Sequence, residues 1–328
     1  MRSLIARSIL ALLALAHAPD AAPAQAPPVL PAEDRIRIAE ARRLFDRLGT
    51  TVWPGWSGTA LEVLLVGDSA EFLVGRRSRG EDFTPLGPDS LLGAEVWTRP
   101  RHFPPTLLAT FPVGGISTVV VGSAERTGKR PAAWVLTLLH EQFHRWQYSL
   151  PDYYEAVGRL ELAGGDTTGR WMLDYPFPYD SPPVQMAMRE LGTALARALR
   201  AEPAGPAVRD VIARRDVLRA RLSAADERYL EFQLWQEGVA RFIEYAVARA
   251  AAEAGMRFGG ESYRLAADSG LGTLRRELEE LDLGRQRRVA LYPVGAAMAL
   301  LLDETRPGWK GAYRERPLRL SDLLTQEH

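Results

Sequence analysis

The sequence contains no cysteine among its 328 residues. This absence excludes disulfide bonds, thiolate metal sites and cysteine nucleophiles. Basic and acidic side chains are equally numerous, 41 of each, so the chain lacks the basic excess of a nucleic-acid-binding protein. Lysine is also scarce, since Lys129 and Lys310 are its only examples. Together with abundant alanine, this bias towards arginine indicates a bacterial genome of high GC content and not a function.

The sequence also lacks a long apolar run. Residues 8–16 form a short apolar segment, well below the ~20 residues that span a bilayer. Arg2 and Arg7 flank its start, and Ala22-Pro23-Ala24 offers an A-x-A cleavage site behind it, so we expect residues 1–24 to be a signal peptide. An uncleaved anchor is the alternative. We therefore expect an exported protein, periplasmic or secreted, without membrane insertion once the signal is removed.

The remaining sequence has ordinary globular composition, with 46% apolar and 25% charged residues. In residues 25–130, a helical pattern at 33–48 precedes apolar β-type runs at 61–66, 71–74, 94–98, 107–111 and 116–121. Turn residues at 67–69 and 112–115 predict two hairpins. Residues 131–328 are mostly helical in pattern, with long helices expected at 132–149, 184–200, 208–222, 226–254 and 289–303. These patterns predict an α+β fold with a small N-terminal β-containing part packed on a mostly helical C-terminal part.

The strongest chemical signal is His140-Glu141-Gln142-Phe143-His144, an H-E-x-x-H motif. On a helix, two histidines four positions apart lie on one face and can bind one Zn²⁺ ion. The glutamate after the first histidine is turned about 100° around the helix, so it can act as general base for a water molecule instead of as a ligand. The preceding residues 132–139 are uncharged and fit a buried helix. A core helix with two hydrogen-bonded histidines is the alternative.

A hydrolytic zinc site needs a third protein ligand and an open position for water. His102 and His328 are poor candidates, because the first lies in a proline-rich loop and the second ends the chain. The helix expected at 226–254 offers carboxylates instead, at Glu231, Glu237 and Glu244.

The positions of these glutamates on the helix separate them. Glu237 and Glu244 are about two turns apart and share a face, whereas Glu231 points about 120° away and is expected on a solvated face. The small residues Gly238 and Ala240 allow a second helix to pack closely beside Glu237.

An H-E-x-x-H motif followed by a helix with E-G-x-A-x-x-x-E resembles the gluzincin peptidases. Residues 235–245 are similar to the second zinc motif of the M1 family of aminopeptidases. This resemblance implies a zincin-like fold whose C-terminal part carries the H-E-x-x-H helix. It also implies that Glu237 is the third zinc ligand beside His140 and His144, with Glu244 behind them as a carboxylate that holds a ligand histidine.

Such a hydrolase also needs a group that stabilises negative charge on the attacked carbonyl oxygen. The candidates in this sequence are Tyr292, His102, Tyr175 and Tyr179. Tyr292 directly precedes a proline at the expected start of a helix. The resemblance favours Tyr292, because a tyrosine downstream of the zinc glutamate has this role in M1-like enzymes.

The run at 116–121 directly precedes the metal-binding helix. It is expected either to border the cleft and pair with an extended peptide or to be an ordinary core strand. The aromatic residues Trp53, Trp56, Trp134, Trp146 and Trp235 are expected in the core.

These features predict an exported zinc-dependent metallohydrolase that acts on a peptide or protein substrate, with Glu141 as general base. Hydrolysis of a non-peptide amide would use the same residues. A non-catalytic exported binding or scaffold protein that keeps a zincin fold is the alternative from a different class.

Overall fold

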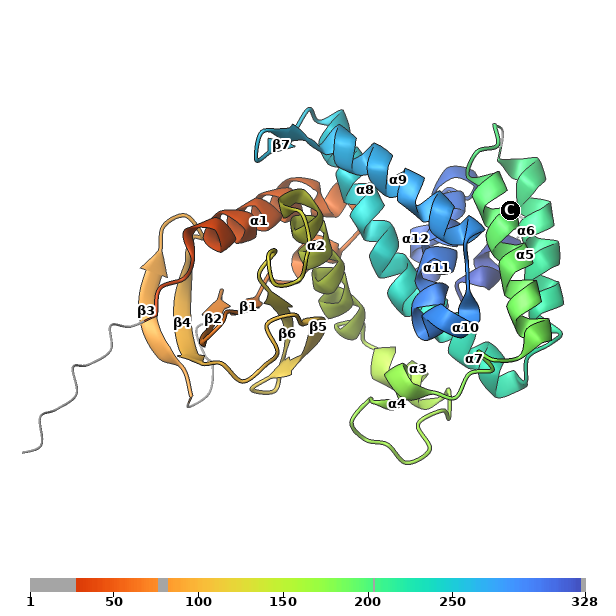
Figure 1. The fold of residues 1–328 in the computed structure, drawn as a ribbon, viewed down its shortest axis with the longest axis horizontal. Coiled ribbons are helices and arrows are strands. Elements are labelled where there is room, and N and C mark those ends of the chain that lie inside the picture. Colours follow the sequence, from red (N-terminus) through yellow and green to blue (C-terminus); the bar gives the residue numbers. More distant parts are fainter. Residues whose placement is uncertain (1–27, 76–81, 203, 326–328) are drawn as a thin grey trace, which may run out of the picture.

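The computed structural model describes residues 28–75, 82–202 and 204–325. The expected signal peptide at 1–24 and the C-terminal His328 lie outside this range. The fold is mixed α+β, with an N-terminal sheet and a helical C-terminal part (Figure 1). Within the described residues, no helix is both long and apolar enough to cross a bilayer.

Within the part of the chain that the structure describes, six strands form one N-terminal sheet in the order β3-β4-β2-β1-β6-β5. Their bounds are β1 (Val63–Val66), β2 (Ala70–Val74), β3 (Thr84–Asp89), β4 (Ala94–Pro100), β5 (Leu108–Val113) and β6 (Ile116–Gly122). Neighbouring strands are antiparallel except β1 and β6, which run parallel. Both expected hairpins, β1–β2 and β5–β6, are present. The second turns at Gly114 and Gly115, whose φ angles of 58° and 77° suit a tight hairpin turn.

The run at 116–121 is the interior strand β6, between β1 and β5, so of its two expected placements the core strand is confirmed, and β5 is the edge strand on this side. Strand β3 was not expected, because Pro85 and Pro88 interrupt its pattern. It occupies the opposite edge of the sheet, where proline is tolerated.

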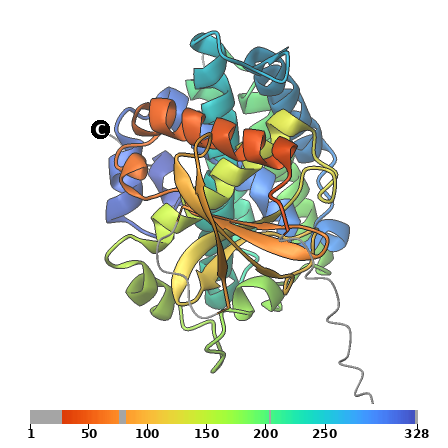
Figure 2. The ribbon, with the colours of Figure 1, turned by 90° about the vertical axis from the view of Figure 1, so that its left-hand side faces the viewer.

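The long N-terminal helices are α1 (Ala32–Val52) and α2 (Pro131–Tyr148). Helix α2 packs on β5 and β6 with one side and on the C-terminal helices with another, so it joins the two parts of the molecule. Alternate sheet residues such as Val63 and Val119 face this shared core, and their neighbours Leu64 and Val120 form a smaller core on the other face. Figure 2 shows the twisted sheet towards the viewer, with α1 running above it and the helical part behind.

The described residues of the C-terminal part form ten further helices and one short two-stranded sheet. The helices are α3 (Tyr153–Gly158), α4 (Trp171–Asp174), α5 (Pro182–Ala198), α6 (Gly205–Arg219), α7 (Ala224–Gln233), α8 (Val239–Glu253), α9 (Tyr263–Glu279), α10 (Leu283–Gln286), α11 (Leu291–Thr305) and α12 (Trp309–Glu315). The remaining elements are the 3-10 turns η1 (Trp56–Gly58), η3 (Arg287–Ala290) and η4 (Ser321–Thr325), the π-helical turn η2 (Leu234–Gly238), and strands β7 (Arg257–Phe258) and β8 (Glu261–Ser262).

The helix expected at 226–254 is continuous but irregular, because η2 joins α7 to α8 as a wider π-helical turn. Such turns are rare and occur frequently at functional sites. The expectation for the tryptophans is confirmed, since all five are buried: Trp53, Trp56, Trp134, Trp146 and Trp235.

Candidate metal centre

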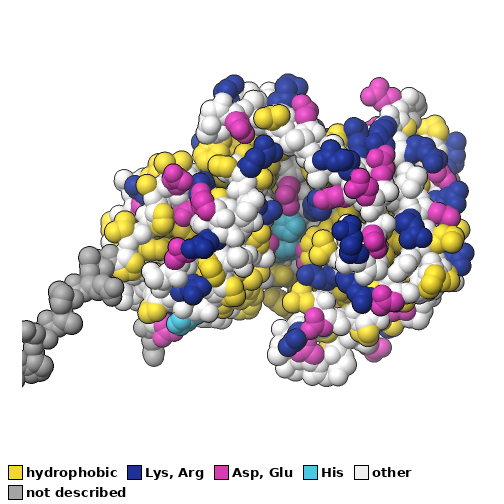
Figure 3. Space-filling view, in the orientation of Figure 1, with side chains coloured by type: hydrophobic (Ala, Val, Ile, Leu, Met, Phe, Trp, Pro, Cys, Tyr) yellow, Lys and Arg dark blue, Asp and Glu magenta, His cyan; other side chains and the backbone are white. Residues whose placement is uncertain are grey.

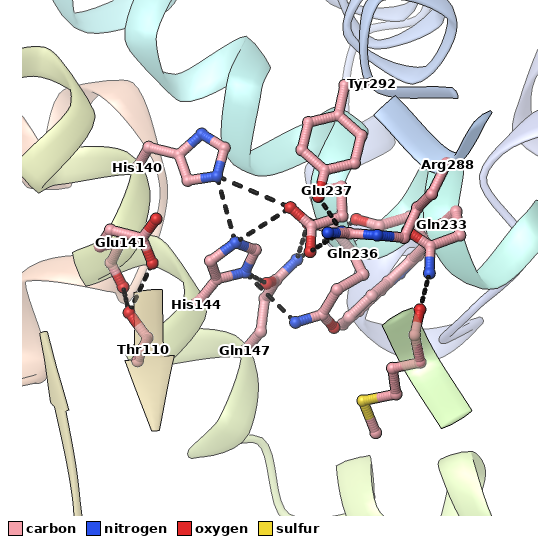
Figure 4. Close-up of polar contacts among 12 residues, drawn as sticks. Thr110, His140, Glu141, His144, Gln147, Gln233, Gln236, Glu237, Arg288 and Tyr292 are labelled. Atoms are coloured by element: carbon pink, nitrogen blue, oxygen red, sulfur yellow. Dashed lines mark hydrogen bonds and ion pairs between the residues drawn. The ribbon is translucent and has the colours of Figure 1, made fainter. Parts of the chain in front are cut away.

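Helix α2 places the H-E-x-x-H motif at the junction of the two parts. Its residues from Trp134 to Gln147 are all buried, which explains the uncharged run before the motif. His140 and His144 face the η2–α8 helix, while Glu141 is turned towards strand β5 (Figure 4).

His140, His144 and Glu237 form a compact group of three side chains. The Nε2 atoms of His140 and His144 are 3.2 Å apart. Glu237 Oε2 lies 3.8 Å from His140 Nε2 and 3.5 Å from His144 Nε2. Tetrahedral zinc ligands, each at about 2.0–2.1 Å from the metal, are about 3.3–3.4 Å from one another. The three atoms therefore fit one metal ion, and this group could hold one.

Close packing of two helices brings Glu237 into this position. The next residue, Gly238, meets Gly295 of α11 so tightly that a Cβ on Gly238 would lie 2.4 Å from Gly295 Cα. The expected close approach of a second helix is therefore confirmed. Because α11 also carries Tyr292, the same contact fixes that tyrosine relative to Glu237.

The outer ring nitrogens of both histidines have partners. His140 Nδ1 lies 2.9 Å from Glu244 Oε1, which places Glu244 where the resemblance put it. His144 Nδ1 lies 2.7 Å from Gln147 Oε1. Such partners fix the orientation of a metal-binding imidazole and the tautomer that presents Nε2 to the metal.

Gln147 was not singled out from the sequence, although it follows His144 by one helical turn. It is fully buried, and its Nε2 lies 3.0 Å from the carbonyl oxygen of Gln236 and 2.7 Å from the hydroxyl of Tyr313. Gln236 belongs to η2, so Gln147 links the two helices that carry the candidate ligands.

Glu141 lies beside this group without joining it. The hydroxyl of Thr110 is 2.8 Å from Glu141 Oε2 and is placed equally close to the backbone carbonyl of Glu141. Thr110 comes from the edge strand β5, which therefore borders the site, whereas the run at 116–121 is a core strand. No sequence motif marks Thr110, because its place beside Glu141 depends on the strand order.

Among the expected oxyanion stabilisers, the structure brings Tyr292 to Glu237 (Figure 4). Burial and the negative charge of Glu237 raise the pKa of this phenol well above its ordinary value. Arg288, also missed from the sequence, contacts the Tyr292 hydroxyl and lies 3.7 Å from Glu237 Oε1. By contrast, the side chain of His102 is exposed, and the hydroxyl of Tyr175 donates to an aspartate of α7. The last candidate, Tyr179, packs against Phe177, with 5.1 Å between the ring centroids.

The charges around the three side chains favour a cation. Burial alone would lower the pKa of His140, but the nearby carboxylates of Glu237 and Glu244 outweigh burial and raise that pKa to about 10. Burial would raise the pKa of Glu237, but the adjacent His144 and His140 hold it well below its usual range. The site thus stabilises positive charge between the carboxylates, as a metal site requires.

The expectation for Glu231 was wrong. Its side chain is 1% exposed and accepts hydrogen bonds from the backbone nitrogen and the hydroxyl of Ser321. The C-terminal turn η4 covers this face of α7. A local helical pattern does not reveal a cover that comes from so far along the chain.

The site opens into a cleft between the two parts of the molecule. Figure 3 shows this hollow, with histidine side chains (cyan) at its floor and basic side chains (dark blue) along the wall formed by the helical part. Comparisons of the chain with protein-family models, with curated proteins and with solved structures find no match. The geometry of the site itself therefore carries the functional inference.

Proposed function

We propose that this protein is an exported zinc-dependent hydrolase of peptide bonds with a zincin-like fold. The observation that supports it most strongly is the set of distances among His140, His144 and Glu237, with Glu141 held beside them but outside the group. The proposal that the protein is exported rests on residues 1–24, whose sequence resembles a signal peptide. The open cleft provides room for an extended peptide.

In this proposal each side chain has one role. His140, His144 and Glu237 would hold the metal. Bound zinc supplies a Lewis acid that lowers the pKa of water towards about 7 and polarises a carbonyl group. Glu141 accepts the proton of the attacking water and then delivers it to the leaving nitrogen. The phenol of Tyr292 donates a hydrogen bond to the carbonyl oxygen as negative charge develops there.

The surrounding contacts support this division of roles. Thr110 bonds to one carboxylate oxygen of Glu141, which leaves Oε1 for the water. Glu244 and Gln147 bond to the outer nitrogens of the histidines, so both Nε2 atoms point towards Glu237. A purely structural metal site has no use for a carboxylate in the position of Glu141, which favours an enzyme over a scaffold protein.

The test is the substitution Glu141→Gln, assayed on a mixture of peptides by mass spectrometry. We expect the variant to keep its bound zinc and to lose hydrolysis by a factor of about 10²–10⁴, because only the general base is removed. Glu155→Gln is the matched control, since Glu155 is an exposed carboxylate on the neighbouring helix α3. Full activity of Glu141→Gln would refute the assignment. A zinc-loaded wild type that cleaves no peptide would favour the binding or scaffold protein.

A further inference from the structure

We infer that Arg288 forms a carboxylate-binding subsite beside the metal centre, so that the protein selects peptides with a carboxylate next to the cleaved bond. This inference rests on the proposed function and adds the class of substrate to it. The carboxylate can be the C-terminus of the peptide or an acidic side chain, since both present the same group.

The contacts of Arg288 leave one edge of its guanidinium group available. Its contacts with the Tyr292 hydroxyl and with Glu237 Oε1 are both made by Nη1. Within residues 28–75, 82–202 and 204–325, the structure records no hydrogen bond or ion pair of Nε or Nη2 of Arg288. These two nitrogens form the edge that binds a carboxylate through two parallel hydrogen bonds.

The charge of Arg288 is only partly compensated. Glu237 is its one acidic partner among the described residues, at 3.7 Å, and the other oxygen of Glu237 faces the histidines. A guanidinium group is always protonated, so this charge persists at every working pH. The side chain is 24% exposed, which makes it reachable from the cleft.

The backbone before Arg288 is strained. Arg287 has φ 52° and ψ −135°, a conformation that residues with a side chain rarely adopt, and its own side chain is turned away to Asp180 at 2.7 Å. Strain of this kind is concentrated at functional sites. Here the strained backbone lies at the point where Arg288 is directed towards Glu237 and Arg287 towards the surface.

The contact between Arg288 and Tyr292 suits a carboxylate one residue from the cleaved bond. The carbonyl oxygen of that bond must lie within reach of Tyr292, and Arg288 contacts the Tyr292 hydroxyl. One residue spans about 3.3–3.8 Å. A carboxylate on the residue after the cleaved bond therefore comes within reach of the free guanidinium edge.

The test measures binding to the Glu141→Gln variant, which is silenced as an enzyme. Two matched pairs of probes separate the sources of the carboxylate. Acetyl-Ala-Phe is compared with its C-terminal amide, and acetyl-Ala-Asp-amide is compared with acetyl-Ala-Asn-amide. Calorimetry is performed on zinc-loaded and on chelator-treated protein, because zinc itself attracts carboxylates.

We expect one carboxylate probe to bind about 10- to 100-fold more tightly than its neutral partner, with or without zinc. The second substitution Arg288→Gln should abolish this preference, and Arg288→Lys should retain only part of it. Arg287→Gln, which removes the same charge one residue away, should leave it intact. Thermal melts of the metal-free variants identify any that fail to fold.

Equal affinity within both pairs, no binding of any probe at millimolar concentration, or a preference that survives Arg288→Gln would overturn the inference. Failure of the proposed function is separate. An active peptidase with no carboxylate preference contradicts only the subsite, whereas a carboxylate preference without any peptide hydrolysis contradicts only the enzymatic role.

Discussion

The contact between Gly238 and Gly295 gives the most quantitative prediction, for the substitution Gly238→Ala. The new Cβ would lie 2.4 Å from Gly295 Cα, 2.8 Å from Gly295 C and 3.1 Å from Ala296 N. All three are backbone atoms, so no side-chain rotation relieves the overlap. Carbon atoms pack at about 3.5–4.0 Å, and η2 and α11 must therefore separate by about 1 Å.

This separation has a cost that can be worked out. Overpacking of a tight contact costs about 1–3 kcal/mol, and a backbone clash belongs at the upper end of that range. The better helix propensity of alanine offsets about 0.5–1 kcal/mol of it. We expect a net loss of about 2 kcal/mol in the free energy of unfolding, which lowers the melting temperature by about 3 °C in a protein of about 300 residues.

Thermal unfolding followed by circular dichroism measures this loss. Gly272→Ala in α9 is the matched control, because a Cβ there meets no atom within 4 Å. Gly272→Ala should raise the free energy of unfolding by about 0.5–1 kcal/mol. The same glycine-to-alanine substitution should therefore stabilise the protein at position 272 and destabilise it at position 238. Peptide hydrolysis by Gly238→Ala should fall about 100-fold, because Glu237 moves relative to Tyr292. A Gly238→Ala protein as stable and as active as wild type would refute the packing argument.

Two further predictions concern the histidines. Gln147→Met keeps the volume of a buried side chain but removes the oxygen that accepts from His144 Nδ1 and leaves only the Gln236 amide nitrogen, at 3.2 Å, beside it. Zinc affinity measured by competition with a chromogenic chelator should therefore fall about 10- to 100-fold; an unchanged affinity would show that Gln147 does not position His144. The pKa of His140 is raised from 6.5 to about 10 in the metal-free protein, so zinc must displace its proton, and apparent zinc affinity should rise about tenfold per pH unit from pH 6.5 to 9. Because the pKa of His140 is higher in the folded state, its protonation stabilises the metal-free fold fully below pH 6.5, and this stabilisation is lost as the pH rises towards 10. The melting temperature of the metal-free protein should therefore fall over that range. A zinc affinity and a melting temperature that do not change with pH would contradict this account.

The part of the site that the sequence predicts is the part set by helical spacing. His140 and His144 lie one turn apart, and Glu237 and Glu244 lie two turns apart, so each pair falls on one face whatever surrounds it. The small residue Gly238 likewise predicts a close helix contact, although it does not identify the partner helix. Helical periodicity and turn residues also located both hairpins and most long helices.

The rest depends on contacts between distant segments. Thr110 reaches Glu141 because β5, and not β6, ends the sheet on this side. Gln147 finds its carbonyl partner because a π-helical turn interrupts the second helix, which a regular 3.6-residue pattern does not anticipate. Arg288 lies in the site because the preceding residue, Arg287, has a backbone conformation that is rare for arginine. Helix α9, at 263–279, was also missed.

The central claim is that His140, His144 and Glu237 hold one zinc ion, and metal content tests it most directly. The wild type, Glu237→Gln and the control Glu155→Gln are loaded with zinc, dialysed against metal-free buffer and measured by elemental analysis. We predict about one zinc per chain in the wild type and the control, and sharply less in Glu237→Gln. A wild type that retains no metal after zinc is added back would contradict the claim, and the two histidines would then be core residues.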